Sequence, residues 1–349
     1  MHATTMSPRS HRTRLVPEVQ RPRFGTAQVW VESPLQMLSA IEAHAAGLLG
    51  RHTEIHPRGG AAGLDTTMRT LMGQTPLGVR FGETGQQVPS ARNLETNRWV
   101  TGDAYSGRIQ REILGPIRAD EVVIIDDGLA TVKLLATLTR DRPTPLVRPR
   151  APRSTARTVL GLAAWYRLRS LARQGRLMAL TALPIRLDVE EAFRGLGGHL
   201  EHHRFEWLGT RPVAEQFHEP TILVGSAMAA DGLIREQPYL NWVLAQTEDG
   251  PVGYFPHRRE GAGFLTRLAR HPLVTVHRNT IPVEMRLRGL RHSQSVRALP
   301  STVLPSLRLL LGPNRVRIIG HAVPEHWWTD AASPELRTHL GSSLEDPTS

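Results

Sequence analysis

Apolar and polar positions follow one another along the chain in a pattern of strand, turn and helix. In the first part, residues 28–31 form a short apolar run, and apolar residues then recur at helical spacing. Ser33 is a favourable N-cap for this helix, and Pro34 suits its first position. A second apolar run at 122–125 predicts another strand, followed by a helix at 129–139.

The same unit recurs after residue 215, with short polar turns between the apolar runs. The strands predicted there lie at 221–224, 252–255, 273–277, 296–299 and 315–319. The helices predicted there lie at 237–246, 263–269, 279–290 and 303–311. This alternation predicts α/β domains with mostly parallel sheets.

The length of 349 residues predicts two domains, because it exceeds what one core usually holds. We expect a disordered basic tail at 1–23, a Rossmann-like domain at 24–141, an arginine-rich linker and helical region at 142–215, a second Rossmann-like domain at 216–330, and a carboxyl-terminal tail at 331–349. Without cysteine, the chain has no disulfide framework and no thiolate metal site. No apolar run is long enough to span a membrane, and no secretory signal is recognised, so a cytoplasmic location is expected.

The net charge of +11 raises the question of nucleic-acid binding. All basic residues except Lys133 are arginines, a bias typical of a GC-rich coding background. Aromatic residues are sparse, and no nucleic-acid-binding signature appears, so we expect no nucleic-acid partner. Ten arginines and no acidic residue lie between Arg142 and Leu187. The helical pattern in this stretch favours an ordinary surface helix, with peripheral membrane contact between Arg142 and Arg186 as the alternative.

Polar residues gather where predicted strands end or helices begin. Asp126 and Asp127 directly follow one strand, and similar positions hold Gly225, Ser226, His257, Glu284, Ser301 and Thr302. Open α/β sheets bind ligands at this edge, and helix amino termini there favour phosphate. Two such blocks facing each other would form the GT-B architecture of many glycosyltransferases, with a nucleotide donor in one block and an acceptor in the other.

Seven segments occur in an order that resembles a known family: "VESPLQMLSAIEA", "TGDAYS", "VVIIDDG", "ILVGSAMAADGLIREQPYLNWV", "GYFPHRRE", "NTIPVEM" and "ALPSTVL". Together they are similar to the bacterial sialyltransferase and polysialyltransferase group that includes glycosyltransferase family 52. That group is marked by an acidic-acidic-Gly motif, a His-Pro motif and a later Ser/Thr pair. The resemblance covers roughly residues 28–320.

The resemblance implies transfer of a sialic-acid-type sugar, with inversion, from a CMP donor to a glycan or glycolipid hydroxyl. Such a role belongs to the biosynthesis of bacterial cell-surface polysaccharides or capsules. One of Asp126 and Asp127 would be the general base, because a carboxylate is ionised at neutral pH and a neighbouring carboxylate can raise its pKa. A protonated His257 and the hydroxyls of Ser301 and Thr302 would stabilise the leaving CMP.

The remaining roles that the resemblance implies are supporting ones. Glu284 would bind the donor ribose or base, and Gly225 and Ser226 would also contact the donor. Ser33 and Gln36 are acceptor-side candidates. No metal and no cofactor are expected.

Each motif also has an ordinary structural explanation. Asp-Asp-Gly favours a turn, Ser301 and Thr302 can cap a helix, and Glu284 can lie in a first helical turn. The family histidine is usually followed by proline, whereas Arg258 follows His257. We prefer His257 to His271 of the His-Pro pair, because His257 ends a strand within a Y-x-P-H-x-x-E pattern and His271 precedes one.

Two other function classes remain open. One is a transferase for another CMP-sugar, such as a Kdo-type donor. The other is a non-catalytic protein that binds anionic surface polymers through its arginine-rich region. A dinucleotide dehydrogenase is disfavoured, because no G-x-G-x-x-G follows a predicted strand.

Overall fold

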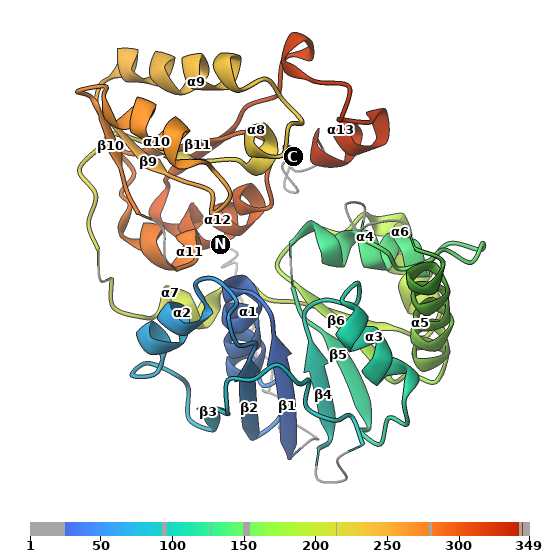
Figure 1. Cartoon of the computed structure of the whole chain (residues 1–349). Helices are drawn as coiled ribbons and strands as arrows, with labels where there is room; N and C mark the ends of the chain where they lie inside the picture. The colour runs from blue at the N-terminus through green and yellow to red at the C-terminus, as the bar shows by residue number, and fades with distance from the viewer. Residues whose placement is uncertain are drawn as a thin grey trace, which may run out of the picture.

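The protein folds into two α/β domains, each built on a parallel sheet (Figure 1). The computed structural model describes residues 25–92, 96–126, 128–148, 154–213, 215–278, 281–341 and 344. The first domain has a seven-stranded sheet in the order β3-β2-β1-β4-β5-β6-β7, and the second has a five-stranded sheet in the order β10-β9-β8-β11-β12. The predicted α/β class with parallel sheets is confirmed.

The first domain begins at β1. Its strands are β1 (Thr26–Val31), β2 (His52–Pro57), β3 (Val79–Phe81), β4 (Arg98–Thr101), β5 (Glu121–Ile124), β6 (Leu177–Thr181) and β7 (His199–His202). Its helices are α1 (Pro34–Ala45), α2 (Leu64–Leu71), α3 (Gly107–Leu114), α4 (Leu129–Leu138), α5 (Thr155–Arg173), α6 (Leu187–Gly195) and the short α7 (Glu206–Gly209). The inner strands are continuously apolar, as strands covered on both faces must be.

The second domain follows the predicted elements closely. Its strands are β8 (Thr221–Val224), β9 (Val252–Phe255), β10 (Val274–Val276), β11 (Ser295–Ala298) and β12 (Arg317–Gly320). Its α-helices are α8 (Ala227–Ala230), α9 (Glu236–Ala245), α10 (Ala262–Ala269), α11 (Val283–Arg286), α12 (Val303–Leu311) and α13 (Pro334–Gly341). Short 3-10 turns follow α9, α11 and α12 and precede α13.

The boundary of the first domain differs from the expected one. We expected the domain to end at residue 141, but α5, β6, α6 and β7 belong to it, and β6 and β7 complete its sheet. The apolar spacing at 158–180 is helical, but this stretch contains the end of one helix and a strand. α5 ends at Arg173, and Gly175, with a φ of 66°, turns the chain into β6. Composition alone suggested a linker because arginine and proline dominate the approach to α5.

The arginine-rich α5 packs against its own domain. Its buried face carries Ala164, Trp165 and Leu168, and it lies against α3 and α4 (Figure 1). The Arg169 guanidinium stacks over the Trp165 ring at 4.7 Å, so part of the positive charge covers apolar surface. This is the packing of an ordinary surface helix. Peripheral membrane contact stays a prediction, and none of the described helices is long and apolar enough to cross a membrane.

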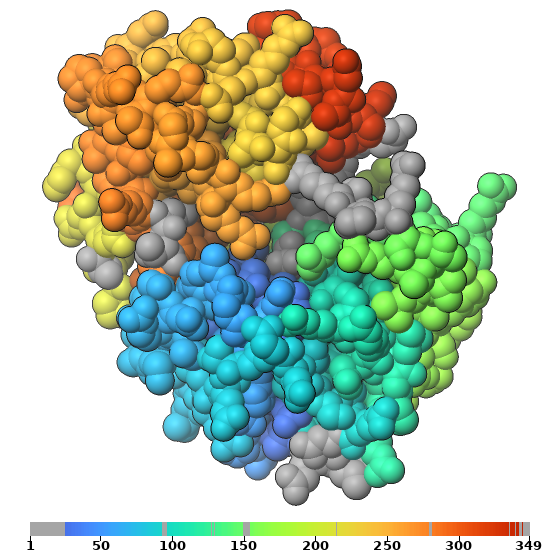
Figure 2. Space-filling model, viewed as in Figure 1, coloured from blue at the N-terminus to red at the C-terminus, as the bar shows by residue number. Residues whose placement is uncertain are grey.

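The two domains share one apolar cluster at their junction. Val29 and Val100 of the first domain and Leu287 and Leu304 of the second belong to it. Buried Glu42 of α1 accepts hydrogen bonds from the amides of Trp207 and Leu208 in α7, at 3.1 and 2.8 Å. In the space-filling view, segments of the second domain coloured orange rest on blue segments of the first (Figure 2). The carboxyl ends of both sheets therefore face the region between the domains.

Candidate active site

The acidic turn, residues 126–128, follows β5 at the carboxyl edge of the first sheet. Asp126 is buried, with 3% of its surface exposed. One carboxylate oxygen accepts the Thr181 hydroxyl at 2.9 Å, and the other accepts the Ala182 amide at 2.8 Å. Asp126 therefore ties the end of β5 to the end of β6. Asp127 lies outside the described residues.

The acidic turn meets the second domain at Gly128. This glycine has a φ of 69°, a left-handed conformation that side chains rarely adopt. A Cβ built on Gly128 would lie 3.3 Å from both Oγ1 and Cγ2 of Thr302. The structure thus places the glycine of the Asp-Asp-Gly motif directly beside Thr302, although the two belong to different domains.

The Ser/Thr pair forms the amino terminus of α12. The Ser301 hydroxyl accepts the Val303 amide at 3.3 Å, while Thr302 is the N-cap and makes no capping bond with its side chain. The first turn of α12 carries no acidic residue. The Val303 and Leu304 amides already donate to the hydroxyl and carbonyl of Ser301, and Pro305 has no N–H. The helix dipole and the two hydroxyls are therefore what favour an anionic group at this end of α12, next to Gly128.

A polar network lies behind Gly225, where β8 ends. Oε1 of Glu260 accepts the hydroxyls of Tyr254 and Tyr239, at 2.6 and 3.1 Å. Oε2 of Glu260 accepts the His257 amide at 2.7 Å, and the Tyr239 hydroxyl accepts the Ser226 amide at 3.0 Å. The network therefore links the loops after β8 and β9, which carry Ser226 and His257.

Gly225 has no side chain, and the hydrogen-bond network fills the space that a side chain there would occupy. A Cβ built on it would lie 2.8 Å from the His257 amide nitrogen and 2.8 Å from the Tyr254 hydroxyl, closer than real Cβ atoms approach such groups. The close approach of the loop to the network explains why glycine is needed here. Ser226 caps α8 by accepting the Met228 amide at 3.2 Å.

His257 is neutral at pH 7 in this structure. Burial, together with the nearby Arg259 and Arg258, lowers its pKa to about 4. Its Nδ1 accepts the Arg259 amide at 3.2 Å, so the ring proton resides on Nε2. A protonated histidine was expected here, whereas the structure has a neutral ring with one N–H donor.

Two acidic residues of the second domain have raised pKa values. Burial raises the pKa of Glu260 to about 7, although the tyrosine hydroxyls and the His257 amide oppose the shift. Burial also raises the pKa of Glu284, in the first turn of α11, to about 6. Because α11 packs against α12, Glu284 lies on an element next to the helix that Thr302 caps. Perturbed carboxylates of this kind concentrate at functional sites.

The acceptor-side candidates are held within the first domain. Ser33 caps α1 by accepting the Gln36 amide at 3.3 Å, and the buried Gln36 side chain accepts the Glu32 amide at 2.7 Å while packing on Gly102. Glu32 in turn accepts the Ser106 hydroxyl at 3.1 Å. Ser33 and Gln36 therefore fix the position of Glu32 at the carboxyl end of β1.

Glu32 opens onto a cavity of about 560 Å³ that we call the arginine pocket. The five arginines that line it are Arg58, Arg108, Arg111, Arg148 and Arg157. Glu32 lies 3.6 Å from Arg58 and 3.9 Å from Arg148, which also pairs with Asp103. Arg108, Arg111 and Arg157 form no ion pair with a carboxylate of the described chain, so the pocket keeps an excess of positive charge.

Lys133 lies in α4, one and a half turns after the acidic turn. Its side chain is half-buried, and its amine lies 5.8 Å from the centre of the Tyr105 ring, which also borders the arginine pocket. Burial and the charge of Arg140 lower the pKa of Lys133. The only lysine of the chain thus lies between the acidic turn and the acceptor-side edge.

The structure brings several predicted residues together. Gly128 meets Thr302 across the domains, and Gly225, Ser226 and His257 are joined through Glu260. His271 lies between α10 and β10, at the amino-terminal edge of the second sheet, away from the carboxyl edge where His257 lies. Among the described residues, no group of three His, Asp or Glu side chains is arranged to hold a metal ion.

No functional role was predicted from the sequence for the three residues of the network, Glu260, Tyr239 and Tyr254. A tyrosine within an apolar parallel strand was the available signal, because a buried hydroxyl requires a partner. The arginine pocket was also missed. Its five arginines come from separate segments of the chain, so only the fold gathers them.

Comparisons with known proteins bear on the fold. No protein-family model matches the sequence, and no curated protein matches it. The chain is similar to a 2,6-sialyltransferase from the Vibrionaceae bacterium Photobacterium sp., solved with CMP and lactose: the TM-score is 0.50 and the identity 12%, over 91% of this chain and 76% of that one. It also matches a UDP-glucose:anthocyanidin 3-O-glucosyltransferase, with a TM-score of 0.47, 10% identity, and coverage of 93% and 94%. Two facing parallel-sheet domains, with this likeness to the sialyltransferase, give the chain a GT-B glycosyltransferase-like fold.

Proposed function

We propose that the protein is an inverting glycosyltransferase that moves a sialic-acid-type sugar from a CMP donor to a hydroxyl of a glycan acceptor. The observation that carries this proposal is the approach of Gly128 to Thr302. It brings the acidic turn, at Gly128, into contact with the amino-terminal end of α12 across the domain boundary. A reaction between a hydroxyl nucleophile and a nucleotide leaving group requires this pairing of a base with an anion-stabilising helix end.

In the proposed step, the acceptor oxygen attacks the anomeric carbon of the donor sugar. A carboxylate of the acidic turn takes the hydroxyl proton, and the bond from the anomeric carbon to the phosphate oxygen breaks. The electron pair of that bond leaves with CMP, and attack from the opposite face inverts the configuration. Both oxygens of Asp126 accept hydrogen bonds from the β6 end, so we assign Asp126 to positioning the turn and Asp127 to proton transfer.

The second domain would stabilise the leaving phosphate. Nε2–H of neutral His257 can donate a hydrogen bond, and a bound phosphate would raise the pKa of this ring from about 4 by its negative charge. The hydroxyls of Ser301 and Thr302 would add further donors. Glu284 is the candidate for contacts with the ribose or base, and Gly225 and Ser226 for contacts with the donor.

On the other side of the site, the arginine pocket supports a glycan or glycolipid acceptor that carries negative charge. Ser33 and Gln36 would act there indirectly, by fixing Glu32. No metal or cofactor is part of the proposal.

The test combines CMP binding by calorimetry with transfer and hydrolysis assays that use CMP-sialic acid. We expect wild type to bind CMP, and the pair Ser301→Ala/Thr302→Val to weaken binding at least tenfold. Asp127→Asn should retain CMP binding and lose at least a hundredfold in turnover. Ser333→Ala is the matched control, because Ser333 also accepts a helix amide but lies at the start of α13. A protein that neither binds CMP nor turns over its sugar derivatives would overturn the proposal.

The same assays separate the alternatives. Turnover with CMP-Kdo in place of CMP-sialic acid would keep the reaction class and change the donor. Binding of an anionic polysaccharide with no CMP binding would favour the non-catalytic polymer-binding protein. Full turnover by Asp127→Asn with loss in Asp126→Asn would exchange the roles assigned to the two aspartates.

A further inference from the structure

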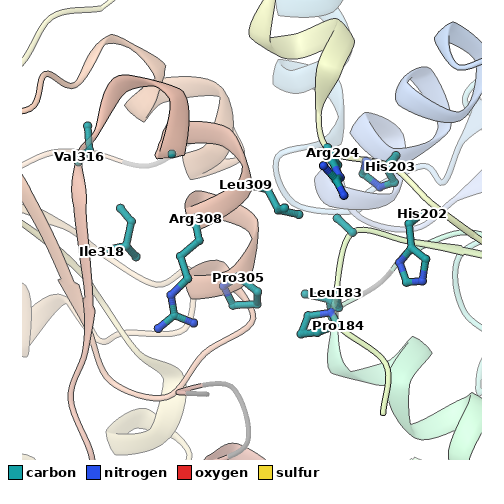
Figure 3. A pocket seen from close by; sticks show the side chains of 12 residues that line it. Leu183, Pro184, His202, His203, Arg204, Pro305, Arg308, Leu309, Val316 and Ile318 are labelled. Atoms are coloured by element: carbon teal, nitrogen blue, oxygen red, sulfur yellow. The ribbon is translucent and has the colours of Figure 1, made fainter. Parts of the chain in front are cut away.

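A second cavity lies between the two domains, beside α12 and the end of β6. We call it the interdomain pocket. It has a volume of about 530 Å³, within the range of about 300–1,000 Å³ typical of small-molecule sites. First-domain residues after β6 and at the end of β7 form one wall, and α12 with β12 forms the other (Figure 3).

The interdomain pocket combines basic and apolar side chains. His202, His203 and Arg204 face it from the first domain, and Arg308 faces it from the second (Figure 3). Among the described residues that line it, none is acidic. Apolar side chains complete its walls: Leu183, Pro184, Pro305, Leu309, Val316 and Ile318. Such walls fit a ligand with one anionic group and an apolar body.

His203 gives an independent indication of a ligand. Only 2% of its surface is exposed, and neither ring nitrogen has a hydrogen-bond partner in the part of the chain that the structure describes. Its only ring contact of note is an edge-on arrangement with Phe205, at 4.7 Å between centroids. Burial and the neighbouring His202 lower its pKa to about 4, so the ring is neutral and has one N–H donor and one acceptor. A buried polar group without a partner destabilises the folded chain, and a bound ligand that supplied the partner would remove this cost.

We propose that the interdomain pocket is a second binding site, for a small organic anion with an apolar body. Its phosphate or carboxylate lies against Arg204 and accepts the ring N–H of His203, while Arg308 adds positive charge on the opposite wall. Its apolar part lies against Leu309 and Ile318. None of the candidate donor residues lines the pocket, so the inference does not rest on the proposed transferase function.

The pocket nevertheless touches the candidate active site through two elements. Its first-domain wall begins at Ala182, whose amide donates to Asp126. Its second-domain wall includes the middle turns of α12, the helix that starts at Thr302. A ligand here would contact both domains at once and hold them together.

The experiment is calorimetric titration of the full chain with hexyl phosphate, in the presence and absence of saturating CMP. We expect one hexyl phosphate per chain in both conditions. Hexanol and inorganic phosphate should each bind at least tenfold more weakly, because each lacks one half of the ligand. Hexanoate distinguishes a carboxylate site from a phosphate site according to which probe binds more tightly.

Two variants test whether hexyl phosphate binds in the interdomain pocket. Arg204→Gln changes an exposed side chain and is expected to fold, and it should weaken hexyl phosphate at least tenfold. His203→Phe should do the same while retaining apolar packing near Phe205. Arg270→Gln is the matched control, since Arg270 is exposed at the C-cap of α10 and does not line the pocket. Ser301→Ala/Thr302→Val should also leave binding unchanged.

Three results would overturn the inference: no binding to wild type, equal affinity in wild type and Arg204→Gln, or loss of hexyl phosphate binding in Ser301→Ala/Thr302→Val alone. The last result would assign the probe to the donor site. Loss of CMP binding with intact hexyl phosphate binding would reject the proposed function and leave this inference standing.

Discussion

The ligand-facing edges of the two domains hold their carboxylates in different ways. In the first domain, Glu32 and Asp103 lie near arginines and form ion pairs with them. In the second domain, Glu260 has no cationic partner among the described residues and instead accepts hydrogen bonds from two tyrosines and one amide. An ion pair near the surface is screened by salt, whereas a carboxylate held by neutral donors responds mainly to protons. The two edges should therefore differ in their sensitivity to salt and pH.

The largest effect is expected from disrupting the hydrogen-bond network around Glu260 at Gly225, where the backbone lies closest to it. Gly225→Ala inserts a methyl group against the Tyr254 hydroxyl and the His257 amide. Overpacking and loss of the Glu260 hydrogen bond to the His257 amide together should lower the free energy of unfolding by about 3 kcal/mol. Urea unfolding followed by tryptophan fluorescence measures the change, and CMP affinity should fall with it.

Gly263→Ala provides the control for that substitution. A Cβ on Gly263 meets nothing within 4 Å, and the residue lies within α10. Alanine there should leave the free energy of unfolding unchanged or raise it by up to about 1 kcal/mol. Equal destabilisation by the two substitutions would mean that the network behind Gly225 has no special role.

The next effect concerns pH and the Glu260 carboxyl. Its pKa is raised from 4.5 to about 7, so the folded state binds the proton more tightly than the unfolded state. The stability from this group is therefore complete below pH 4.5 and is lost as pH rises through 7. Across that window the loss amounts to about 3 kcal/mol. Glu260→Gln should remove the loss, so the free energy of unfolding of the variant relative to wild type should rise between pH 4.5 and pH 8.

His257 acts in the opposite direction. Its pKa is lowered from 6.5 to about 4, so its contribution is complete above pH 6.5 and is lost as pH falls towards 4. In wild type the two pH dependences of the free energy of unfolding should therefore partly cancel. In His257→Gln only the dependence due to Glu260 should remain. Parallel pH profiles for wild type and Glu260→Gln would contradict the assignment of the titrating group.

The smallest effect is expected at the first-domain edge. The Arg148 side chain is half exposed, so its pairs with Glu32 and Asp103 are screened by solvent. Arg148→Gln should lower the free energy of unfolding by about 1 kcal/mol or less at low salt, and by less still in 0.5 M NaCl. If salt changed the cost of Gly225→Ala more than that of Arg148→Gln, the contrast between the two edges would be rejected.

The sequence predicted the second domain more fully than the first. Its strands are short, continuous apolar runs separated by polar turns, and each appears within a few residues of the predicted place. In the first domain, β2 and β7 carry histidine and glutamate among their apolar positions, because one side of each is only partly buried. β6 was hidden because its apolar residues continue the helical spacing of α5. Partial burial and a change of period within one apolar stretch account for these misses.

The site was predicted as a set of positions but not as a set of contacts. Placing Asp126, His257 and Thr302 at strand ends required only the order of elements. The partners of Asp126 lie about 55 residues away, on a strand that was not recognised. The Glu260 network likewise joins α9, β9 and the following loop, and no local pattern encodes such a meeting.

The solitary lysine has a practical consequence for experiments on this molecule. Reagents that acylate amines will find a single side-chain target, Lys133, in a sequence whose other basic residues are arginines and histidines. Its lowered pKa leaves more of the reactive neutral amine available than an exposed lysine would have. A fluorophore attached there would report from α4, between the acidic turn and the arginine pocket. The chain therefore already has one side chain through which a label can be attached to α4, without an engineered cysteine.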